Sequence, residues 1–438
     1  MNTNKVFHPN RQFQYLILTA AVLFLLPLIF LSCQDLRTQT ITWVEYEPVY
    51  MSHEEFINAV QLEASRGLKN PGKIYFYDGY LFVNEINKGI HILDNRDPSA
   101  PANIGFINIP ANKDIAVRND LLYADSQKDL LVFDISSLQN PELIERIEGV
   151  FNNSANTPPG FTTQSVDESR GLVVDWKPVV REEICEGNCH THPAHSFQGG
   201  RVAFDSFTTA SSGGGAPQTG VGGSMTRFAI IGDYLYAVDH RDLMTFDVSS
   251  ANTQKVHRQY VGWLIETIFP YKDNLFIGSV NSMYIYSLSN PAAPHQLSIF
   301  RHATACDPVV VEGDYAYVTL RSGENCPNIQ GSDQLEVIDV SDLKNPKNIG
   351  IYEMINPHGL GIDDGRLFIS EGAYGLKLMD ATDPYKIKEI KHIKNIETYD
   401  VIPLNGVLMV TGESGIIQFD YTNAPDLKHL STIPVIDN

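Results

Sequence analysis

Basic side chains are scarce in this sequence. Its 438 residues include 32 Lys and Arg against 52 Asp and Glu, which gives a formal net charge of −20 at pH 7. Because such a surface repels polyanions at long range, we set nucleic acid aside as a partner. Charged residues make up only 19% of the chain and hydrophobic residues 43%, which argues against disorder throughout and indicates an ample core.

Several sequence signatures of catalysis are missing as well. No Gly-Xaa-Ser-Xaa-Gly elbow stands before a helix-forming segment, and neither a Trp-Asp repeat ending nor the Ser-x-Asp-x-Gly-x-Thr-Trp box of sialidases occurs. The glycine-rich segment 205–223 lacks the lysine and the following helix of a phosphate-binding loop. We expect a flexible tether there.

The amino terminus has the layout of an export signal. Lys5 and Arg11 precede an uncharged apolar run over residues 15–32, which ends at Cys33. The segment Phe-Leu-Ser-Cys at 30–33 resembles the bacterial lipobox, whose cysteine is diacylated and becomes the new amino terminus. We therefore expect a lipoprotein signal peptide over 1–32, lipidation of Cys33, and an anchor linker with an extension over 33–72. A transmembrane anchor is the alternative, and both place the remainder outside the cytoplasm.

Two short elements are predicted within this extension. The run ITWVEYEPVY at 41–50 is a strand candidate. A helical turn is expected near SHEEFINAVQL, because Ser52 with Glu55 three residues later forms the pattern of a capping box.

The remainder of the chain, 73–438, repeats with a period of about forty residues. The landmark of each unit is the residue that closes its third apolar run: Asp94, Asp134, Asp247, Ser287, Asp339, Asp380 and Asp420. Successive landmarks lie 40 or 41 residues apart, except for two longer steps of 113 and 52 residues. Seven landmarks predict seven units.

Each unit offers four short apolar runs, and Asp-Gly, Asn-Asp or Asn-Gly pairs typical of tight hairpins separate the first two in most units. Four antiparallel strands form a blade that cannot cover both of its faces alone, so the blades pack around an axis. The sequence therefore predicts an all-β, seven-bladed β-propeller of four-stranded antiparallel blades. An open solenoid is the alternative.

The end of the third run and its exit carry a family resemblance. The segments LLVFDISSLQNP, LEVIDVSDLKNP and GLKLMDATDP resemble the LVIVD-repeat family of bacterial cell-surface propellers. The resemblance covers nearly all of the chain from Lys73 onward. It implies a fold and a location, and it brings no shared catalytic residue.

Both longer steps place their extra residues on the same face of the ring. The insertion 151–223, between blades two and three, is a blade-to-blade loop, and the extra segment 321–333 joins the second and third strands of blade five. Because strands alternate in direction, these two loop types emerge together. We name this side, formed by blade-to-blade loops and second-to-third-strand turns, the insertion face, and we expect it to be the binding side. Within the insertion, RGLVVDWKPVVREE from Arg170 alternates like a strand, forming a hairpin or adding to a blade edge.

The cysteines and histidines give two further predictions. Cys306 and Cys326 both fall on loops of the insertion face, so we expect a disulfide between them in an oxidising compartment. The segment ICEGNCHTHPAHSF also crowds thiols and imidazoles. It allows a local Cys185–Cys189 disulfide, a zinc or other divalent-metal site, or solvated residues with no ligand; the candidate metal ligands are Cys185, Cys189, His192 and His195, beside His190.

The start of each innermost strand points toward the ring axis, where propellers commonly bind small ligands. Aligned units place there Lys73, Asp114, Arg227, Thr267, Asp307, His358 and Asp400. From these we predict an axial ligand site of Asp114, Arg227, Asp307, His358 and Asp400. The alternative is a water-filled channel whose mouth is polar because it is wet.

These features favour a non-catalytic binding module for an envelope protein or a glycan, with no obligatory cofactor. A hydrolase or lyase that uses Asp114, Asp307, Asp400 and His358 is one alternative, and a structural envelope component is another. We expect an exported monomer held by its lipid at the outer membrane or cell surface rather than the inner membrane.

Overall fold

The computed structural model describes residues 38–152, 162–163, 166–186, 209–210, 220–224, 226–302, 308–322 and 333–436. The chain divides into two units, one of residues 1–44 with 180–200 and one of residues 45–179 with 201–438. In the smaller unit, residues 38–44 and 180–186 belong to the adjacent strands β1 (Thr38–Met51) and β12 (Leu172–Glu186).

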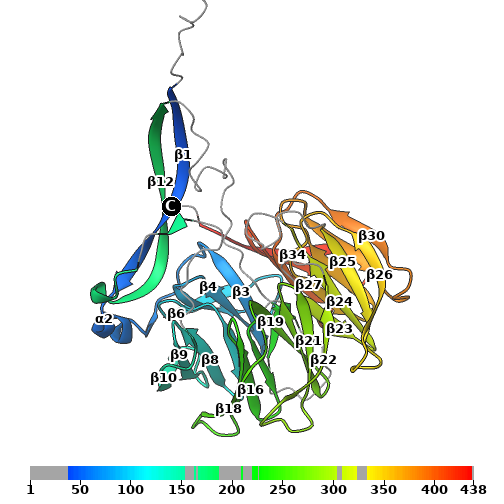
Figure 1. Ribbon diagram of the computed structural model, residues 1–438, viewed down its shortest axis with the longest axis horizontal. Helices are drawn as coiled ribbons and strands as arrows, with labels where there is room; N and C mark the ends of the chain where they lie inside the picture. Colours follow the sequence, from blue (N-terminus) through cyan, green and yellow to red (C-terminus); the bar gives the residue numbers. More distant parts are fainter. Residues whose placement is uncertain are drawn as a thin grey trace, which may run out of the picture. The chain divides into compact units, whose positions relative to one another are not determined.

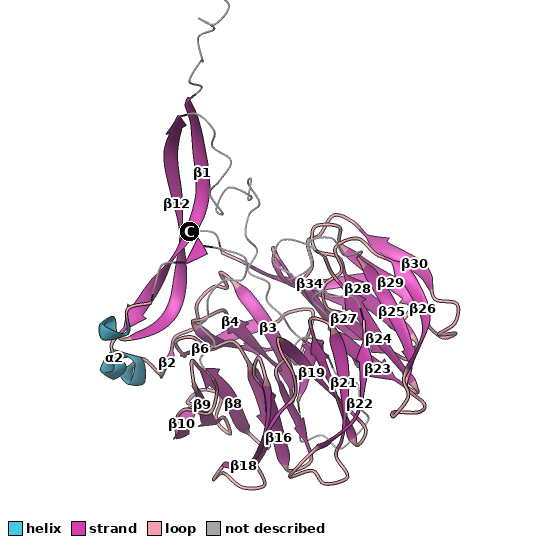
Figure 2. Ribbon diagram, in the orientation of Figure 1, coloured by secondary structure: helices cyan, strands magenta, loops and turns pink. Residues whose placement is uncertain are grey.

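The larger unit contains seven antiparallel blades, which confirms the predicted all-β propeller (Figures 1 and 2). Blade 1 consists of β3 (Pro71–Tyr77), β4 (Tyr80–Glu85), β5 (Gly89–Asp94) and β6 (Ala102–Asn108), and blade 2 consists of β7 (Ile115–Arg118), β8 (Leu121–Ser126), β9 (Asp129–Asp134) and β10 (Glu142–Ile147). Blade 3 consists of β15 (Phe228–Ile231), β16 (Tyr234–Val238), β17 (Asp242–Asp247) and β18 (Gln254–Tyr260), and blade 4 consists of β19 (Ile265–Tyr271), β20 (Asn274–Ser279), β21 (Ser282–Ser287) and β22 (His295–Arg301). Blade 5 consists of β23 (Val309–Glu312), β24 (Tyr315–Leu320), β25 (Gln334–Asp339) and β26 (Lys347–Glu353). Blade 6 consists of β27 (Leu360–Asp363), β28 (Arg366–Ser370), β29 (Leu376–Asp380) and β30 (Lys388–Ile393). Blade 7 consists of β31 (Asp400–Leu404), β32 (Val407–Gly412), β33 (Gly415–Asp420) and β34 (Lys428–Pro434).

The landmark residues are the last residues of the third strands, as predicted, and the structure gives their physical role. In six blades the aspartate Oδ1 accepts a hydrogen bond from the backbone N–H two residues later, which fixes the exit turn. In blade 4 the Ser287 hydroxyl accepts the same bond from Ser289. A local turn motif therefore sets the repeat that the sequence displays.

The first hairpins also follow the predicted chemistry. Asp78 and Gly79 have φ of 46° and 80°, and Asn405 and Gly406 have φ of 52° and 82°. Such left-handed pairs fit the twist of the two flanking strands. Blade 4 reaches φ 51° at Lys272, where the sequence offers neither glycine nor asparagine.

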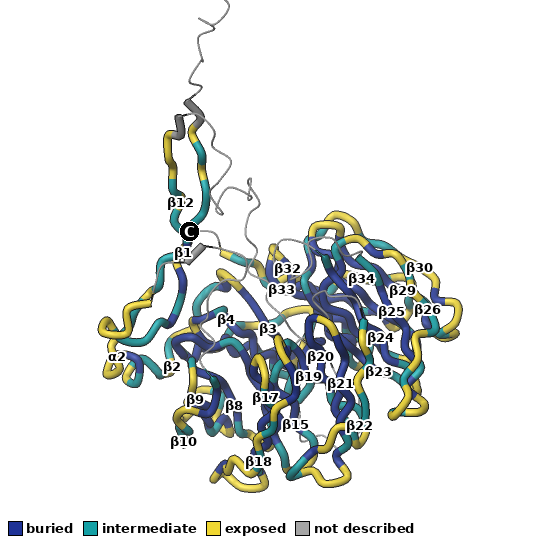
Figure 3. Tube along the Cα trace, viewed as in Figure 1, coloured by how far each residue is buried: buried dark blue, intermediate teal, exposed yellow. Residues whose placement is uncertain are grey.

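Side-chain packing closes the ring. Buried apolar clusters join each blade to the next, and one cluster places Ile74, Leu81 and Leu93 of blade 1 with Met409 and Ile416 of blade 7. Figure 3 shows the inner strands of the blades largely buried, whereas the outermost strands and the loops at the strand ends are more exposed. An amide pair reinforces the same seam: Asn95 Nδ2 donates to Gln418 Oε1 at 3.0 Å and Gln418 Nε2 donates to Asn95 Oδ1 at 2.7 Å. Seven closed blades exclude the open solenoid.

Blade 1 carries three additional strands. β2 (Gln61–Glu63) pairs with its outer strand β6, while β14 (Val221–Ser224) pairs with its innermost strand β3 and β13 (Thr209–Ala210) pairs with β14. The tether expected over 205–223 is thus wrong for these two segments, which form strands. Ladder hydrogen bonds need no side-chain pattern, so two glycines inside β14 do not prevent pairing.

The segments before the first blade also follow their predictions. β1 contains the predicted strand, and it lies between β11 (Thr162–Thr163) and β12 in a three-stranded sheet. The helix α2 (His53–Asn58) begins with the predicted capping box of Ser52 and Glu55, and its Phe56 packs against Ala111 and Val174. A short 3₁₀ helix, η1 (Glu168–Arg170), precedes β12. The strand predicted from Arg170 is therefore confirmed, but it pairs with β1 rather than with a blade edge.

A buried, hydrogen-bonded carboxylate in blade 1 predicts pH-dependent stability. Glu85 accepts hydrogen bonds from His91 Nε2 at 2.9 Å and from the backbone N–H groups of Lys69 and Asn70 at 3.1 and 2.6 Å. Burial alone would raise the pKa of Glu85, but these bonds outweigh it and lower the pKa below its usual 4.5. The stabilisation is therefore present above the usual pKa and is lost as the pH falls through the folded value.

We expect Glu85→Gln to lower the free energy of unfolding by about 2 kcal/mol at pH 7, and the deficit to shrink toward zero in acid. Urea titrations of both proteins from pH 7 to pH 3 measure this difference. The exposed Glu148→Gln is the matched control and should change little at any pH. A Glu85→Gln deficit of equal size at every pH would contradict the assignment.

Candidate functional site

Six of the seven residues predicted for the axis lie in, or just before, an innermost strand. Lys73, Thr267 and Asp400 are within the innermost strands of blades 1, 4 and 7, while Asp114, Arg227 and His358 stand one or two residues before those of blades 2, 3 and 6. Asp307 lies outside the described residues. Five of the six described residues fall into two groups, one with Lys73, Asp114 and Arg227 and one with His358 and Asp400.

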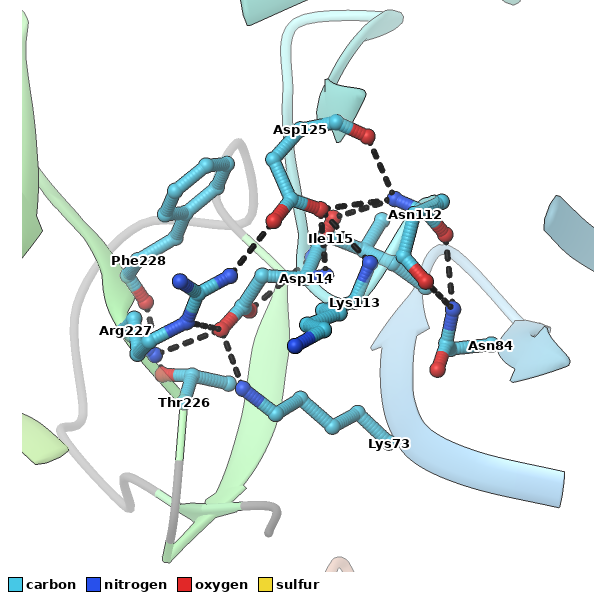
Figure 4. A network of polar contacts seen from close by, with 10 residues as sticks. All are labelled: Lys73, Asn84, Asn112, Lys113, Asp114, Ile115, Asp125, Thr226, Arg227 and Phe228. Atoms are coloured by element: carbon cyan, nitrogen blue, oxygen red, sulfur yellow. Dashed lines mark hydrogen bonds and ion pairs between the residues drawn. The ribbon is translucent and has the colours of Figure 1, made fainter. Parts of the chain in front are cut away.

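The first group is a network centred on the fully buried Asp114 (Figure 4). Its Oδ2 forms an ion pair with Lys73 and accepts from the Arg227 N–H at 2.7 Å, while its Oδ1 accepts from the Ile115 N–H at 2.9 Å. The Arg227 guanidinium lies 3.5 Å from the same Oδ2. Asp114 therefore joins the innermost strands of blades 1, 2 and 3.

Asp125, which the sequence analysis missed, is the second anion of this network. Its Oδ2 accepts from Arg227 Nη2 at 2.5 Å, and its Oδ1 accepts from the backbone N–H groups of Lys113 and Asp114 at 2.7 and 2.8 Å. Asn112 donates to the same Oδ1 at 3.0 Å and accepts from Asn84 at 2.7 Å. The sequence position of Asp125 could have indicated this role, because Asp125 lies near the end of the second strand of blade 2. Second strands end on the face where innermost strands begin, so a polar residue at that end can reach the start of an innermost strand.

Burial and neighbouring charges shift the pKa values of the three cationic side chains of this region in different directions. Burial lowers the pKa of Lys73, which Asp114 counteracts. Burial would also lower the pKa of Arg227, but Asp125 and Asp114 outweigh it and the pKa is raised. Burial, followed by the positive charge of Arg227, lowers the pKa of Lys113 to about 8. In Figure 4 the Lys113 amino group carries no contact, and no described residue forms a hydrogen bond or ion pair with it.

The second group lies at blades 6 and 7. The buried Asp400 accepts from Ser224 Oγ at 3.3 Å, and Ser224 Oγ in turn accepts from the Leu360 N–H at 2.8 Å. The ring of His358 lies 5.8 Å from that of Tyr399, and its backbone carbonyl accepts from Thr319 Oγ1 at 2.7 Å. Asp114 and Asp400 therefore belong to separate clusters with different partners.

Strand β14 connects these groups across the axis. It pairs with β3 through Val221 with Phe76 and Gly222 with Tyr75, and it contacts β27 and β31, the innermost strands of blades 6 and 7. The Tyr75 hydroxyl donates to the Gly220 carbonyl at 3.1 Å. A segment of the insertion therefore occupies part of the axial space where the sequence predicted a ligand or water.

The LVIVD repeat matches residues 111–148, 222–253 and 304–324. The first match spans blade 2, the second spans β15 to β17 of blade 3, and the third spans β23 and β24 of blade 5. The chain therefore contains LVIVD repeats. Comparison with curated proteins gives no match.

Several solved structures are similar to this LVIVD-repeat propeller. A functionally unknown protein from Desulfotomaculum acetoxidans has 9% identity and a TM-score of 0.50, with 83% of this chain and 95% of that chain covered. The computationally designed protein Ika8 has 8% identity and a TM-score of 0.49, with 85% and 92% covered. BamB from Moraxella catarrhalis has 7% identity and a TM-score of 0.47, with 79% and 80% covered. At 9% identity, the likeness to the Desulfotomaculum acetoxidans protein concerns the fold alone.

The predicted metal, disulfide and lipid positions fall mostly outside the described residues of the LVIVD-repeat protein. Cys33, Cys189, His190, His192, His195, Cys306 and Cys326 all lie there, and Cys185 is described only as the penultimate backbone position of β12. Among the described residues, no three His, Cys, Asp or Glu side chains gather in a way that would hold a metal ion. No helix among them has the length and apolarity to cross a bilayer.

Proposed function

We propose that this LVIVD-repeat propeller is a non-catalytic binding module of the cell envelope, which presents its insertion face to a protein or a glycan. The observation that carries the proposal is the commitment of the described axial carboxylates. Asp114 and Asp400 are fully buried and are bonded within the chain, and β14 lies among the innermost strands.

The same observation weighs against the hydrolase or lyase alternative. General acid–base catalysis needs a carboxylate within hydrogen-bond reach of a substrate proton. Asp114 holds Lys73 and the Arg227 backbone, and Asp400 holds the Ser224 hydroxyl, so both carboxylates serve the packing of the blades. Binding at the rim of the ring requires no such group.

Export and lipid anchoring at Cys33 belong to the same proposal. Their support is the charged-then-apolar layout of residues 5–32 followed by the lipobox-like segment. The intact mass of the protein from a bacterial membrane fraction is expected to correspond to a chain that starts at Cys33 and carries acyl groups. A mass that retains residues 1–32 would favour the transmembrane anchor instead.

The binding proposal is tested with the full chain in non-ionic detergent on an array of neutral and acidic glycans and envelope proteins. We expect at least one class to bind, and mass spectrometry to recover a bound glycan intact. Cleavage of a glycan that is lost in His358→Ala would establish the catalytic alternative. Absence of any binding would favour a structural envelope component and overturn the proposal.

A further inference from the structure

The loop 261–264, between blades 3 and 4, exposes two large apolar side chains on the insertion face. Trp263 is 67% exposed and Leu264 is 43% exposed. Leu264 also has a φ of 51°, in the left-handed region that a bulky residue rarely adopts. Because strain of this kind persists only where the surroundings impose it, it calls for a functional explanation.

Backbone bonds hold this loop in place beside the second-to-third-strand turn of blade 3. Val261 N–H and Gly262 N–H donate to the Arg241 carbonyl at 2.8 and 3.3 Å, and Ile265 N–H donates to the His240 carbonyl at 3.0 Å. The Arg241 guanidinium carbon lies 5.7 Å from the centre of the Trp263 ring. The indole is therefore an exposed aromatic platform on a fixed backbone.

His240 links the platform to the Asp114 network. Partial loss of water, followed by the positive charges of Arg227 and Lys113, lowers its pKa to about 4. The Val238 N–H donates to the Arg227 carbonyl at 2.8 Å, so Arg227 is paired with the end of β16, two residues before His240. At neutral pH it is uncharged, with one nitrogen that donates and one that accepts hydrogen bonds.

Donors and acceptors do not balance in this region. Asp125 is bonded to Arg227, and Asp239 accepts from the backbone N–H groups of Arg241 and Asp242. The amino group of Lys113 and the guanidinium of Arg241 have no hydrogen-bond or ion-pair partner among the described residues. The region therefore presents cationic donors whose neighbouring carboxylates are already engaged.

We propose that this part of the insertion face, formed by Lys113, Arg227, His240, Arg241 and Trp263, binds a saccharide that carries a single carboxylate. The sugar ring packs its C–H face on the indole, its hydroxyls bond to His240, and its carboxylate pairs with Lys113 and the remaining N–H groups of Arg227. This inference rests on the proposed binding function and names its ligand class. A densely charged polyanion fits less well, because the chain as a whole carries a formal charge of −20.

Isothermal titration of the full chain in non-ionic detergent tests the proposal, with 3′-sialyllactose and a glucuronate-terminated trisaccharide as probes and lactose as the neutral match. We expect the acidic sugars to bind at least about tenfold more tightly than lactose. Lys113→Gln and Trp263→Ala should each weaken that binding by about tenfold. Tyr385→Ala and Lys386→Gln are matched controls in a third-to-fourth-strand loop, on the opposite face, and should leave it unchanged.

The pH dependence of binding gives a second readout. With a pKa of about 8 in the unbound protein, Lys113 is charged below that pH and loses its proton above it. Affinity for the acidic sugars should therefore hold below pH 8 and fall as the pH rises beyond it, and Lys113→Gln should abolish this fall. Trp263→Ala should weaken binding while leaving the shape of the profile unchanged.

Three outcomes would overturn the proposal. Acidic sugars that bind no better than lactose would exclude carboxylate recognition. Binding that Lys113→Gln and Trp263→Ala leave intact would place the sugar elsewhere. If these probes do not bind but the array captures a neutral glycan or a protein, the acidic saccharide is refuted and the binding function still stands. If nothing binds in either experiment, both proposals are refuted.

Discussion

Asp114→Ala is expected to lower the free energy of unfolding by about 3 to 5 kcal/mol, because it leaves the buried Lys73 ammonium without its counter-charge. Asp114 is fully buried, and it also holds the Arg227 and Ile115 backbone N–H groups. Guanidinium chloride unfolding followed by circular dichroism measures the loss. The tie joins three blades, so the effect should appear as a lower midpoint for the whole propeller.

Two further variants distinguish the loss of the Asp114 contacts from a general sensitivity of the protein's stability to substitution. Asp314→Ala, at an exposed hairpin of blade 5, should change stability by less than about 0.5 kcal/mol. Lys73→Met combined with Asp114→Asn removes both charges and should be less destabilising than Asp114→Ala alone. If Asp114→Ala were as stable as the unaltered chain, the Asp114 carboxylate would not stabilise the packing of blades 1, 2 and 3, and the catalytic alternative would regain support.

Gly359→Ala is expected to cost about 3 kcal/mol through overpacking between blades 6 and 7. A Cβ at this position would lie 1.9 Å from Asp400 Oδ1 and 3.0 Å from Asp400 Cα, so backbone as well as side chain would have to move. The shift would also disturb the Ser224 hydroxyl that bonds Asp400 and Leu360. Thermal unfolding with calorimetry measures the change.

Gly105→Ala is the matched control for this substitution. Gly105 lies in β6, and a Cβ there would meet only Leu62 Cδ1, at an ordinary contact distance of 3.6 Å. Stability should be unchanged or slightly higher, since alanine has less freedom to lose on folding. Equal losses at both positions would show that the contact with Asp400 does not set the cost.

The features predicted from sequence are those that a single repeat determines locally. The landmark aspartates were recognisable because each one bonds the backbone two residues later, so the same residue type recurs at the same place in the period. The capping box of Ser52 and Glu55 was visible for the same reason. Closure into seven blades then followed from the count of repeats.

The features that sequence missed depend on contacts between distant segments. Asp125 pairs with Arg227, which lies 102 positions further along the chain, and nothing in either repeat specifies that pairing. Strand β14 has the sequence Val-Gly-Gly-Ser, which offers no alternating side-chain pattern, and its partner β3 belongs to the first blade. Trp263 stands in a run, VGWLIET, that reads as apolar core although its side chain is exposed.

The central claim is that a strand of the insertion lies among the innermost strands of the ring, so that the described axial carboxylates Asp114 and Asp400 serve the fold and ligands bind at the insertion face. Hydrogen–deuterium exchange of the full chain, followed by mass spectrometry of peptides covering 220–224, tests it most directly. Paired with β3, these amides should stay protected for as long as those of β3 itself. Exchange within seconds, as at the exposed hairpin 232–233, would show a flexible tether and contradict the account.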